Sequence, residues 1–434
     1  MISLPAAVFL WGAAHASFQV EGSPADSDWR RWTHTAGKVH DGTNADLATD
    51  FWNQPERDLE WVKELGANAF RFSLAWERLE PREGVFDDKA FARYSRVLDA
   101  ARARGIEPVV TLLHFALPGW LADQGGLTSP KFDTHFERYA REVQKRLGTK
   151  LSYILTINEP MVQVSFGYLQ GMWPPGKVND TEGASLAAYH LAMAHARAYT
   201  TMKAANPLLK ISIATHWRLF DPHSRWNPLD HFLATYTNRF FNKLFLEAIL
   251  KRKVTFEAMG SKPKKFSFPG QGPLIDFLGV NYYGRMLVQF TAAAPHVKIA
   301  ENAEAKLKSD MGWEVYPEGL ERVFAAWKAM APEGIPIMIT ENGTADKGDR
   351  LRSKFLRDHV AAALAASNKS KVPLLGYIHW SLTDNFEWSE GLGPRFGLVG
   401  VEYPPSGRAK DLKFTKRPAF YEYQKLIKEA SARP

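Results

Sequence analysis

Short apolar runs alternate with amphipathic stretches along the whole chain. The apolar runs occupy residues 7–13, 68–76, 106–115, 152–160, 210–217, 275–283, 335–343 and 374–381. The run at 335–343 is apolar from Ile335 to Ile339, which predicts a strand buried on both faces, and the other runs are also expected to form short strands. The stretches between and after them place apolar residues three and four positions apart, over residues 55–65, 87–104, 133–147, 185–204, 229–250, 317–330, 350–366 and 418–430. This spacing predicts helices.

The order of these elements predicts the fold. Eight strand–helix units in strict alternation indicate a parallel sheet, because parallel strands need crossover connections. Eight units are the number that closes into a (β/α)8 TIM barrel of the α/β class. No strand end carries a glycine-rich phosphate-binding motif of the kind common in open sheets. With no internal repeat or linker in the sequence, we expect residues 1–434 to form a single barrel domain.

Composition limits the classes of function. The chain has 55 Lys and Arg against 47 Asp and Glu, a formal net charge of +8, yet its basic runs are short. A solvated basic surface is therefore expected, without nucleic-acid binding. There is no cysteine, which excludes disulfides and thiolate chemistry and fits a reducing cytosol.

The N-terminal apolar stretch does not indicate a targeting segment. It has no basic residue ahead of it, and it runs directly into Gln19 and Glu21, so a strand is expected there and not a signal peptide. No apolar run reaches the roughly 18 residues of a membrane span. We therefore expect a cytoplasmic protein that does not enter a membrane.

In a barrel, the residues that end the eight strands meet at one mouth. In this sequence they are Gln19, Glu21, Arg71, His114, Asn158, Glu159, His216, Asn281, Tyr283, Glu341 and Trp380. The two deepest carboxylates of this set, Glu159 and Glu341, lie on separate strands, and the set has no HExxH motif or other metal-binding spacing. We expect no metal and no cofactor. His190 and His195 lie five residues apart on one predicted helix, which indicates packing.

Two carboxylates surrounded by hydrogen-bond donors suit the hydrolysis of glycosides. One carboxyl must be protonated to donate to the leaving oxygen, and the other must be ionised to attack the anomeric carbon. An Arg and a Tyr beside one Glu would hold it ionised, since a cation and hydrogen bonds lower a carboxyl pKa. Glu159, next to Asn158 and Pro160, has no obvious cation nearby and can stay protonated. Aromatic walls with polar edges also fit sugars.

Seven motifs in order along the chain resemble glycoside hydrolase family 1, the family of β-glucosidases and β-galactosidases. They are FLWGAAHASFQVEG (9–22), FRFSLAW (70–76), TINEP (156–160), MGWEVYPEGL (311–320), ITENG (339–343), HWSLTDNFEW (379–388) and RFGLVGVEY (395–403). The resemblance extends over nearly the whole chain. One such motif alone would be weak support, whereas the ordered set is specific.

The resemblance implies roles at the matching positions. Glu159 corresponds to the general acid/base and Glu341 to the nucleophile. Arg71 and Tyr283 correspond to the residues that hold the nucleophile, and Asn158 to the one that binds the sugar 2-hydroxyl. The remaining matches are the glycone hydroxyl contacts Gln19, His114, Glu387 and Trp388, the stacking residue Trp380, and the aglycone wall Trp313.

These positions also distinguish branches of the family. Glu387 implies an enzyme for unphosphorylated sugars. Glu at position 159, where the thioglucosidase branch has Gln, argues against that branch. The sequence departs from the family at Phe115-Ala116, where Trp-Asp is usual, and at residues 392–394. Because Phe lacks the indole donor, weaker glycone binding or an altered sugar preference is expected. His216 and Trp173 are left open between structural and binding roles.

The predicted function is that of a retaining, exo-acting β-glycosidase acting on a small-molecule β-glycoside, with the two carboxyl groups about 5–5.5 Å apart. Two alternatives remain, a non-catalytic sugar-binding barrel and an enzyme that mainly performs transglycosylation. The sequence leaves open the preferred glycone (glucose, galactose or fucose) and the oligomeric state.

Overall fold

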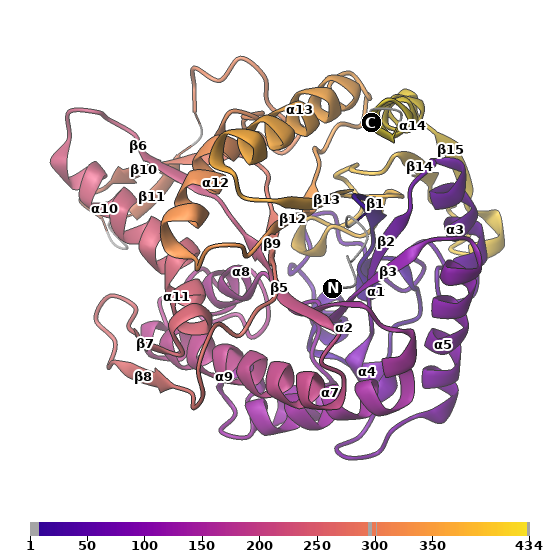
Figure 1. The fold of residues 1–434 in the computed structure, drawn as a ribbon, viewed down its shortest axis with the longest axis horizontal. Coiled ribbons are helices and arrows are strands. Elements are labelled where there is room, and N and C mark those ends of the chain that lie inside the picture. Colours follow the sequence, from indigo (N-terminus) through magenta and orange to yellow (C-terminus); the bar gives the residue numbers. More distant parts are fainter. Residues whose placement is uncertain (1–7, 294–296, 301, 432–434) are drawn as a thin grey trace, which may run out of the picture.

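A closed barrel of eight parallel strands forms the centre of the computed structural model, which describes residues 8–293, 297–300 and 302–431 (Figure 1). The strands are β1 (Leu10–Ala14), β2 (Ala69–Ser73), β3 (Glu107–Leu113), β4 (Tyr153–Asn158), β5 (Lys210–His216), β9 (Leu278–Asn281), β12 (Ile337–Asn342) and β13 (Leu374–His379). β13 pairs with β1 and closes the barrel. The predicted (β/α)8 fold is confirmed. The first predicted strand began at residue 7, which lies outside the described residues.

A ring of helices surrounds the barrel in Figure 1. It comprises α3 (Pro55–Glu64), α5 (Asp88–Ala103), α7 (Phe132–Leu147), α9 (Thr181–Ala205), α11 (Leu244–Lys251), α12 (Gly319–Met330), α13 (Arg352–Ser370) and α14 (Pro418–Ser431). Local chemistry sets the helix ends. For example, the Asp87 carboxylate caps α5 by accepting hydrogen bonds from the backbone N–H groups of Lys89 and Ala90.

The helix predicted over residues 229–250 is present, but it contains a π-helical segment that was not predicted. It consists of α10 (Pro228–Asn238), the π-helical segment η4 (Arg239–Lys243) and α11. The apolar periodicity continues through η4, where Phe240 and Phe241 are buried. The sequence pattern therefore does not reveal the extra residue that a π-helical turn contains. Single-turn π segments occur often near functional sites, and η4 contributes Phe241 to the cavity described below.

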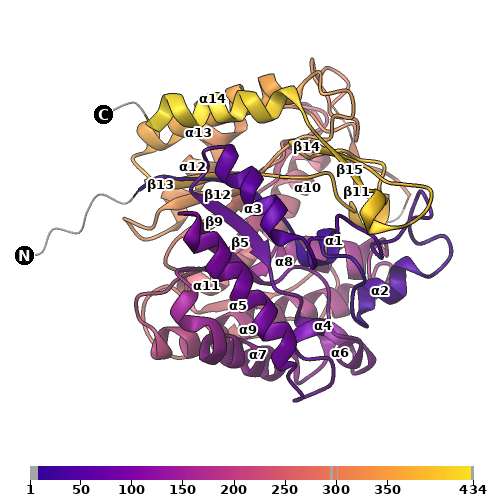
Figure 2. The ribbon, with the colours of Figure 1, turned by 90° about the vertical axis from the view of Figure 1, so that its right-hand side faces the viewer.

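Several short elements were not predicted. β6 (Leu219–Pro222), β10 (Arg285–Phe290) and β11 (Val297–Ala300) form one small sheet, and β7 (Lys253–Phe256) with β8 (Lys264–Ser267) and β14 (Val399–Glu402) with β15 (Lys413–Lys416) form two others. The short helices are α1 (Ser17–Val20), α2 (Asp28–Thr33), α4 (Trp76–Leu79), α6 (Gly119–Asp123) and α8 (Pro160–Val164). The remaining turns are η1 (Gly126–Thr128), η2 (Gly148–Lys150), η3 (Ser165–Leu169), η5 (Trp388–Glu390) and η6 (Ala409–Asp411). Figure 2 shows β11, β14, β15, α1 and α2 gathered at one end of the barrel.

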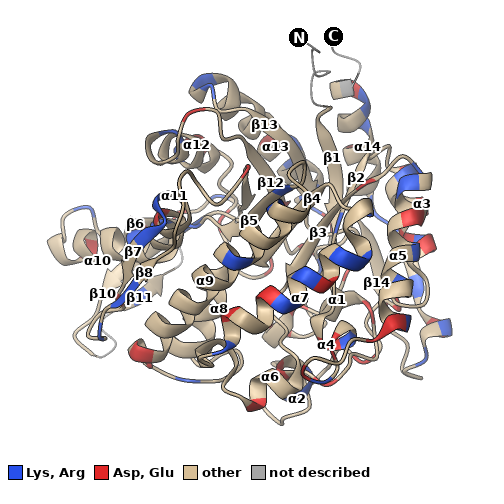
Figure 3. Cartoon of the chain, turned by 60° about the horizontal axis from the view of Figure 1, so that its bottom comes forward, with Lys and Arg blue, Asp and Glu red and all other residues tan. Residues whose placement is uncertain are grey.

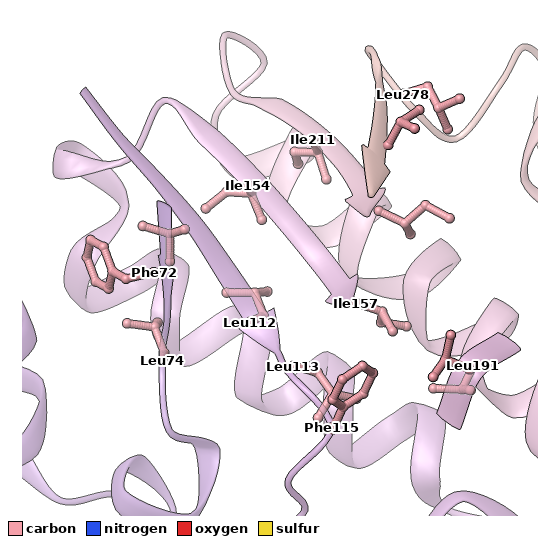
Figure 4. Packing of buried hydrophobic residues seen from close by; sticks show 14 of the residues in the cluster. Phe72, Leu74, Leu112, Leu113, Phe115, Ile154, Ile157, Leu191, Ile211 and Leu278 are labelled. Carbon is pink, nitrogen blue, oxygen red and sulfur yellow. The ribbon is translucent and has the colours of Figure 1, made fainter. Parts of the chain in front are cut away.

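The core has two layers because successive side chains of a strand point to opposite faces. Leu155 faces the inside of the barrel, where it packs with residues such as Val109 and Met338. Its neighbour Ile154 belongs to the larger layer between strands and helices, part of which is drawn in Figure 4. This packing explains the continuous apolar runs, since both faces of each strand are covered.

The surface carries charges of both signs. Figure 3 shows Lys and Arg interspersed with Asp and Glu along the outer faces of α3, α5 and α7. Within the part of the chain that the structure describes, no helix is long and apolar enough to cross a membrane.

Candidate active site

A cavity of about 210 Å³ opens at the C-terminal ends of the barrel strands. Both carboxylates singled out from the sequence line it, and so do most of the other predicted site residues: His114, Asn158, Tyr283, Trp313, Trp380, Glu387 and Trp388. Phe115, Trp173, His216, Arg218 and Phe241 also contribute to the wall. The barrel therefore brings side chains from distant parts of the sequence to one site.

Glu341 is held on both of its carboxylate oxygens. Nη1 of Arg71 donates to Oε1 at 2.6 Å, and the hydroxyl of Tyr283 donates to Oε2 at 2.7 Å. The strand register shifts between Ile339 and Glu341 in the pairing with β9. Such irregularities re-aim side chains, and here the shift lies directly before the carboxylate.

Arg71 is a fully buried hub beneath the cavity. Besides Glu341, it donates to the backbone oxygen of Thr340 at 3.0 Å, to Oγ1 of Thr111 at 3.2 Å and to Oδ1 of Asn158 at 2.7 Å. The planar guanidinium is thereby fixed in direction. A buried cation is tolerated here because these acceptors and the Glu341 carboxylate replace water.

Glu159 directly follows β4 and has a left-handed backbone with φ of 44°. Pro160 then begins α8. Nδ2 of Asn281 donates to Oε1 of Glu159 at 2.8 Å, and Nδ1 of His216 lies 3.4 Å from Oε2. The expectation that Glu159 has no cation nearby is wrong, because Arg218, beyond the end of β5, lines the same cavity and acts on the charge of Glu159.

The two carboxyl groups titrate as a pair. Burial and the negative charge of Glu159 raise the pKa of Glu341 to about 7, although Arg71 and Tyr283 oppose this effect. Burial also acts to raise the pKa of Glu159, but His216, Asn281 and Arg218 outweigh it and the pKa is lowered. The prediction that Glu341 is the more acidic of the two is therefore not met. At pH values between these two pKa values, the pair holds one proton between two sites.

The predicted glycone contacts lie around Glu387. Nε2 of Gln19 donates to the Phe386 backbone oxygen at 2.8 Å and lies 3.4 Å from Oε2 of Glu387. Gln19 itself is fully buried behind this carboxylate. Burial, together with the neighbouring carboxylates Glu341 and Glu159, raises the pKa of Glu387 to about 8.

The His114 ring lies nearly parallel to two indoles. Its centroid lies 5.9 Å from both Trp380 and Trp388, and its Nε2 lies 3.1 Å from Nδ2 of Asn158. Among the described residues, Nδ1 of His114 and Oε1 of Gln19 have no hydrogen-bond partner although both atoms are buried. Such atoms carry a free-energy penalty unless a ligand satisfies them, and sugar hydroxyl groups can do so.

Trp313 and Trp173 both line the cavity and contact different residues of its wall. Trp313 lies edge-on to Tyr283, with ring centroids 5.6 Å apart. Trp173 packs against Phe115 at 4.7 Å and Trp388 at 5.7 Å. Trp173 thus supports the glycone side, a contact that the sequence left open. The sequence also missed Arg218, whose position two residues beyond the end of β5 was the available signal.

His195 of α9 is held by hydrogen bonds inside the protein. His195 lies 2.6 Å from Oγ1 of Thr156 and 2.7 Å from the Leu274 backbone oxygen. Among the described residues, no group of three or more His, Asp and Glu side chains is placed to hold a metal ion.

Comparisons with known proteins agree with this geometry. The sequence model of glycosyl hydrolase family 1 matches residues 3–432. The chain is 35% identical over 424 residues to beta-glucosidase A of Thermotoga maritima, covering 92% of this chain and 94% of that protein. A structure of the Thermotoga maritima beta-glucosidase in complex with deoxynojirimycin matches with a TM-score of 0.86 and 32% identity, covering 98% of each chain. The beta-glycosidase of Pyrococcus horikoshii matches with a TM-score of 0.86 and 32% identity, covering 98% of this chain and 95% of that one.

Proposed function

The chain belongs to glycosyl hydrolase family 1 and is a glycoside hydrolase, and we propose on this basis that it is a retaining, exo-acting β-glycosidase for unphosphorylated β-glycosides. In this proposal, residues 1–434 are one catalytic domain. The observation that carries the proposal is the arrangement of the two carboxyl groups. Glu341 is held between Arg71 and Tyr283 at one side of the cavity, and Glu159 lines the same cavity with a different set of partners.

In the first step, the Glu341 carboxylate attacks the anomeric carbon while Glu159 gives its proton to the glycosidic oxygen. The bond between this oxygen and the anomeric carbon breaks. The alcohol leaves, and the sugar stays bound to Glu341 as a covalent glycosyl ester. The reactive form of the pair is the one with its single proton on Glu159. Arg71 and Tyr283 stabilise the Glu341 carboxylate in that form through charge-assisted hydrogen bonds.

In the second step, the ionised Glu159 accepts a proton from water, and the resulting hydroxide oxygen attacks the anomeric carbon. The ester bond to Glu341 breaks and the sugar leaves with its β-configuration retained. Asn158 is placed for the 2-hydroxyl, since Arg71 and Asn281 fix its Oδ1 at 2.7 and 3.0 Å. Hydrogen bonds to this hydroxyl strengthen in the transition state.

The small cavity supports exo action. Its volume of about 210 Å³ is below the roughly 300–1,000 Å³ of pockets for drug-sized ligands, which fits the end of a glycoside and not a long saccharide. Glucose is the proposed glycone because relatives named beta-glucosidase match over most of the chain. Activity on galactosides and fucosides is part of the proposal. A cytoplasmic location and the lack of nucleic-acid binding stay predictions.

The test is a panel of p-nitrophenyl β-glucoside, β-galactoside and β-fucoside, with Glu341→Ala as the blank. Release of p-nitrophenol by the native chain and loss of release in the variant are expected. A native chain that cleaves none of the three substrates would contradict the proposal and favour a sugar-binding role. Transglycosylation is measured in the same assay by adding an alcohol acceptor and comparing the yields of glycosylated acceptor and free sugar.

A further inference from the structure

Arg218 presents a cation to the cavity without an anionic partner of its own. Its guanidinium carbon lies 5.7 Å from the ring centre of Trp313, and the residue lines the cavity together with Glu159. Within the described residues, its hydrogen bonds are made by its backbone N–H and C=O, and its side chain has no hydrogen bond or ion pair.

Other arginines near the mouth of the barrel are paired. Arg71 is saturated by Glu341 and three further acceptors. Arg285 lies 2.7 Å from a carboxylate oxygen of Glu314, and Arg322 lies 2.6 Å from one of Asp221. Arg218 differs from these three arginines because its side chain has no hydrogen bond or ion pair within the described part of the chain.

The position of Arg218 is fixed by its backbone. Its N–H donates to Oδ1 of Asn242 at 3.1 Å, and its C=O accepts from Nδ2 of Asn242 at 2.6 Å. Asn242 is buried and lies in η4. Because these two hydrogen bonds hold the main chain of Arg218, its side chain extends into the cavity from a fixed position near Glu159 and Trp313.

The charge of Arg218 is least compensated when the enzyme is ready to react. Burial lowers the pKa of Arg218 to about 10, and the negative charge of Glu159 opposes the shift, so the side chain is cationic at neutral pH. In the proposed mechanism, Glu159 is protonated before the leaving group departs. The carboxylate that acts on Arg218 is then neutral, and the guanidinium lacks a counter-charge.

We propose that Arg218 and Trp313 form a subsite for leaving groups that carry a carboxylate. This inference rests on the proposed function, in which Glu159 faces the leaving group. A guanidinium matches a planar carboxylate with two parallel hydrogen bonds, and the Trp313 ring offers a face for an aromatic or sugar ring. A neutral aglycone would leave the cation uncompensated in a half-buried position, whereas a carboxylate supplies both charge and acceptors.

The inference is tested by binding, with no turnover required. The ligands are the 4-carboxyphenyl and 4-carbamoylphenyl 1-thio-β-glycosides, whose sulfur linkage resists hydrolysis and which differ in charge at one group. The glycone is the one preferred in the aryl glycoside panel, or glucose if none is cleaved. Calorimetric titrations near neutral pH compare the native chain, Arg218→Met, Arg218→Lys and Arg225→Met. Arg225 is an exposed arginine beside Trp226, so Arg225→Met removes the same charge outside the cavity.

We expect the native chain and Arg225→Met to bind the carboxylate about tenfold or more tightly than the amide, as for a hydrogen bond to a charged group. Arg218→Met is expected to abolish this preference, and Arg218→Lys to retain part of it. Equal affinities in the native chain, a preference that persists in Arg218→Met, or no binding of either ligand would each overturn the inference. Failure of the proposed function is seen separately, as absence of cleavage in the aryl glycoside panel.

Discussion

The imidazole of His216 and the carboxylate of Glu159 form a buried contact between β5 and the end of β4, with Nδ1 3.4 Å from Oε2. Burial lowers the pKa of His216, with Arg218 acting in the same direction and Glu159 against it. At neutral pH, the imidazole is therefore neutral and can donate its Nδ1–H. This contact stabilises the ionised form of Glu159 and so lowers the pKa of the proposed acid.

Replacing His216 is expected to move the pH dependence of the reaction. In His216→Phe, the ionised form of Glu159 loses a partner, so the pKa of Glu159 rises and the protonated acid persists to higher pH. The alkaline limb of the kcat/KM profile should therefore shift upward. The control His223→Phe changes an exposed histidine on the same connection and should leave the limb in place. An unshifted or downward-shifted limb in His216→Phe would show that this contact does not tune Glu159.

Tyr282 and Tyr283 are adjacent in sequence, but we expect their replacement to have different effects. Loss of the Tyr283 hydroxyl should reduce catalysis, and loss of the Tyr282 hydroxyl should reduce stability. Tyr283→Phe removes the 2.7 Å hydrogen bond to Glu341, and since such a bond to a charged group contributes about 1.5–3 kcal/mol, kcat should fall by about tenfold or more. Tyr282→Phe instead removes a hydrogen bond to the Tyr316 backbone oxygen. It should lower the free energy of unfolding by about 1–3 kcal/mol with little change in kcat. Steady-state kinetics and thermal unfolding measure both effects, and equal loss of kcat in the two variants would contradict the assignment.

We expect the Glu387 carboxyl group to bind the sugar. We also expect its ionisation to lower the stability of the fold. Its pKa is raised from 4.5 to about 8, so folding favours the protonated form, and stability is lost as the pH rises from the unfolded pKa to the folded one. Glu387→Gln should therefore raise the free energy of unfolding, by about 1–3 kcal/mol at pH values above 8 and by little near pH 4.5. Its KM for glycosides should rise. A variant whose stability gain does not grow with pH would contradict this explanation of the raised pKa.

Phe115 is the site where a glycone contact can be restored. Its buried ring packs 5.0 Å from Trp388. Phe115→Trp adds an indole donor, and one hydrogen bond of about 0.5–1.5 kcal/mol should lower KM about two- to tenfold for the glycone whose hydroxyl it reaches. The larger ring should also reduce stability by about 1–3 kcal/mol. Unchanged kinetics on glucoside, galactoside and fucoside would show that Phe115 does not determine glycone binding.

Much of the barrel could be predicted because its strands are buried on both faces. The run from Ile337 to Ile339 is apolar without interruption, and a carboxylate directly after such a run has to lie at the mouth of the barrel. The same reasoning placed Glu159, Arg71 and His114. The ends of strands can thus be predicted from sequence where burial on both faces makes the strand continuously apolar.

The remaining features depend on contacts that sequence spacing does not encode. His216 reaches Glu159 across two adjacent strands, and the direction of the ring follows from packing against Phe241 and Tyr283. Arg218 lies beyond the end of β5, so it escaped a search confined to strand ends. The four-residue strands β6 and β11 are too short to show a period. The pKa order of Glu159 and Glu341 depends on the surroundings of both groups together.

The central claim is that Glu341 is a nucleophile and not a base. The most direct measurement is proton NMR of the sugar first released from an aryl β-glycoside, recorded before mutarotation. The account predicts that the β-anomer appears first and the α-anomer follows as the sugar equilibrates. Initial release of the α-anomer would show direct displacement by water and would contradict the two-step mechanism.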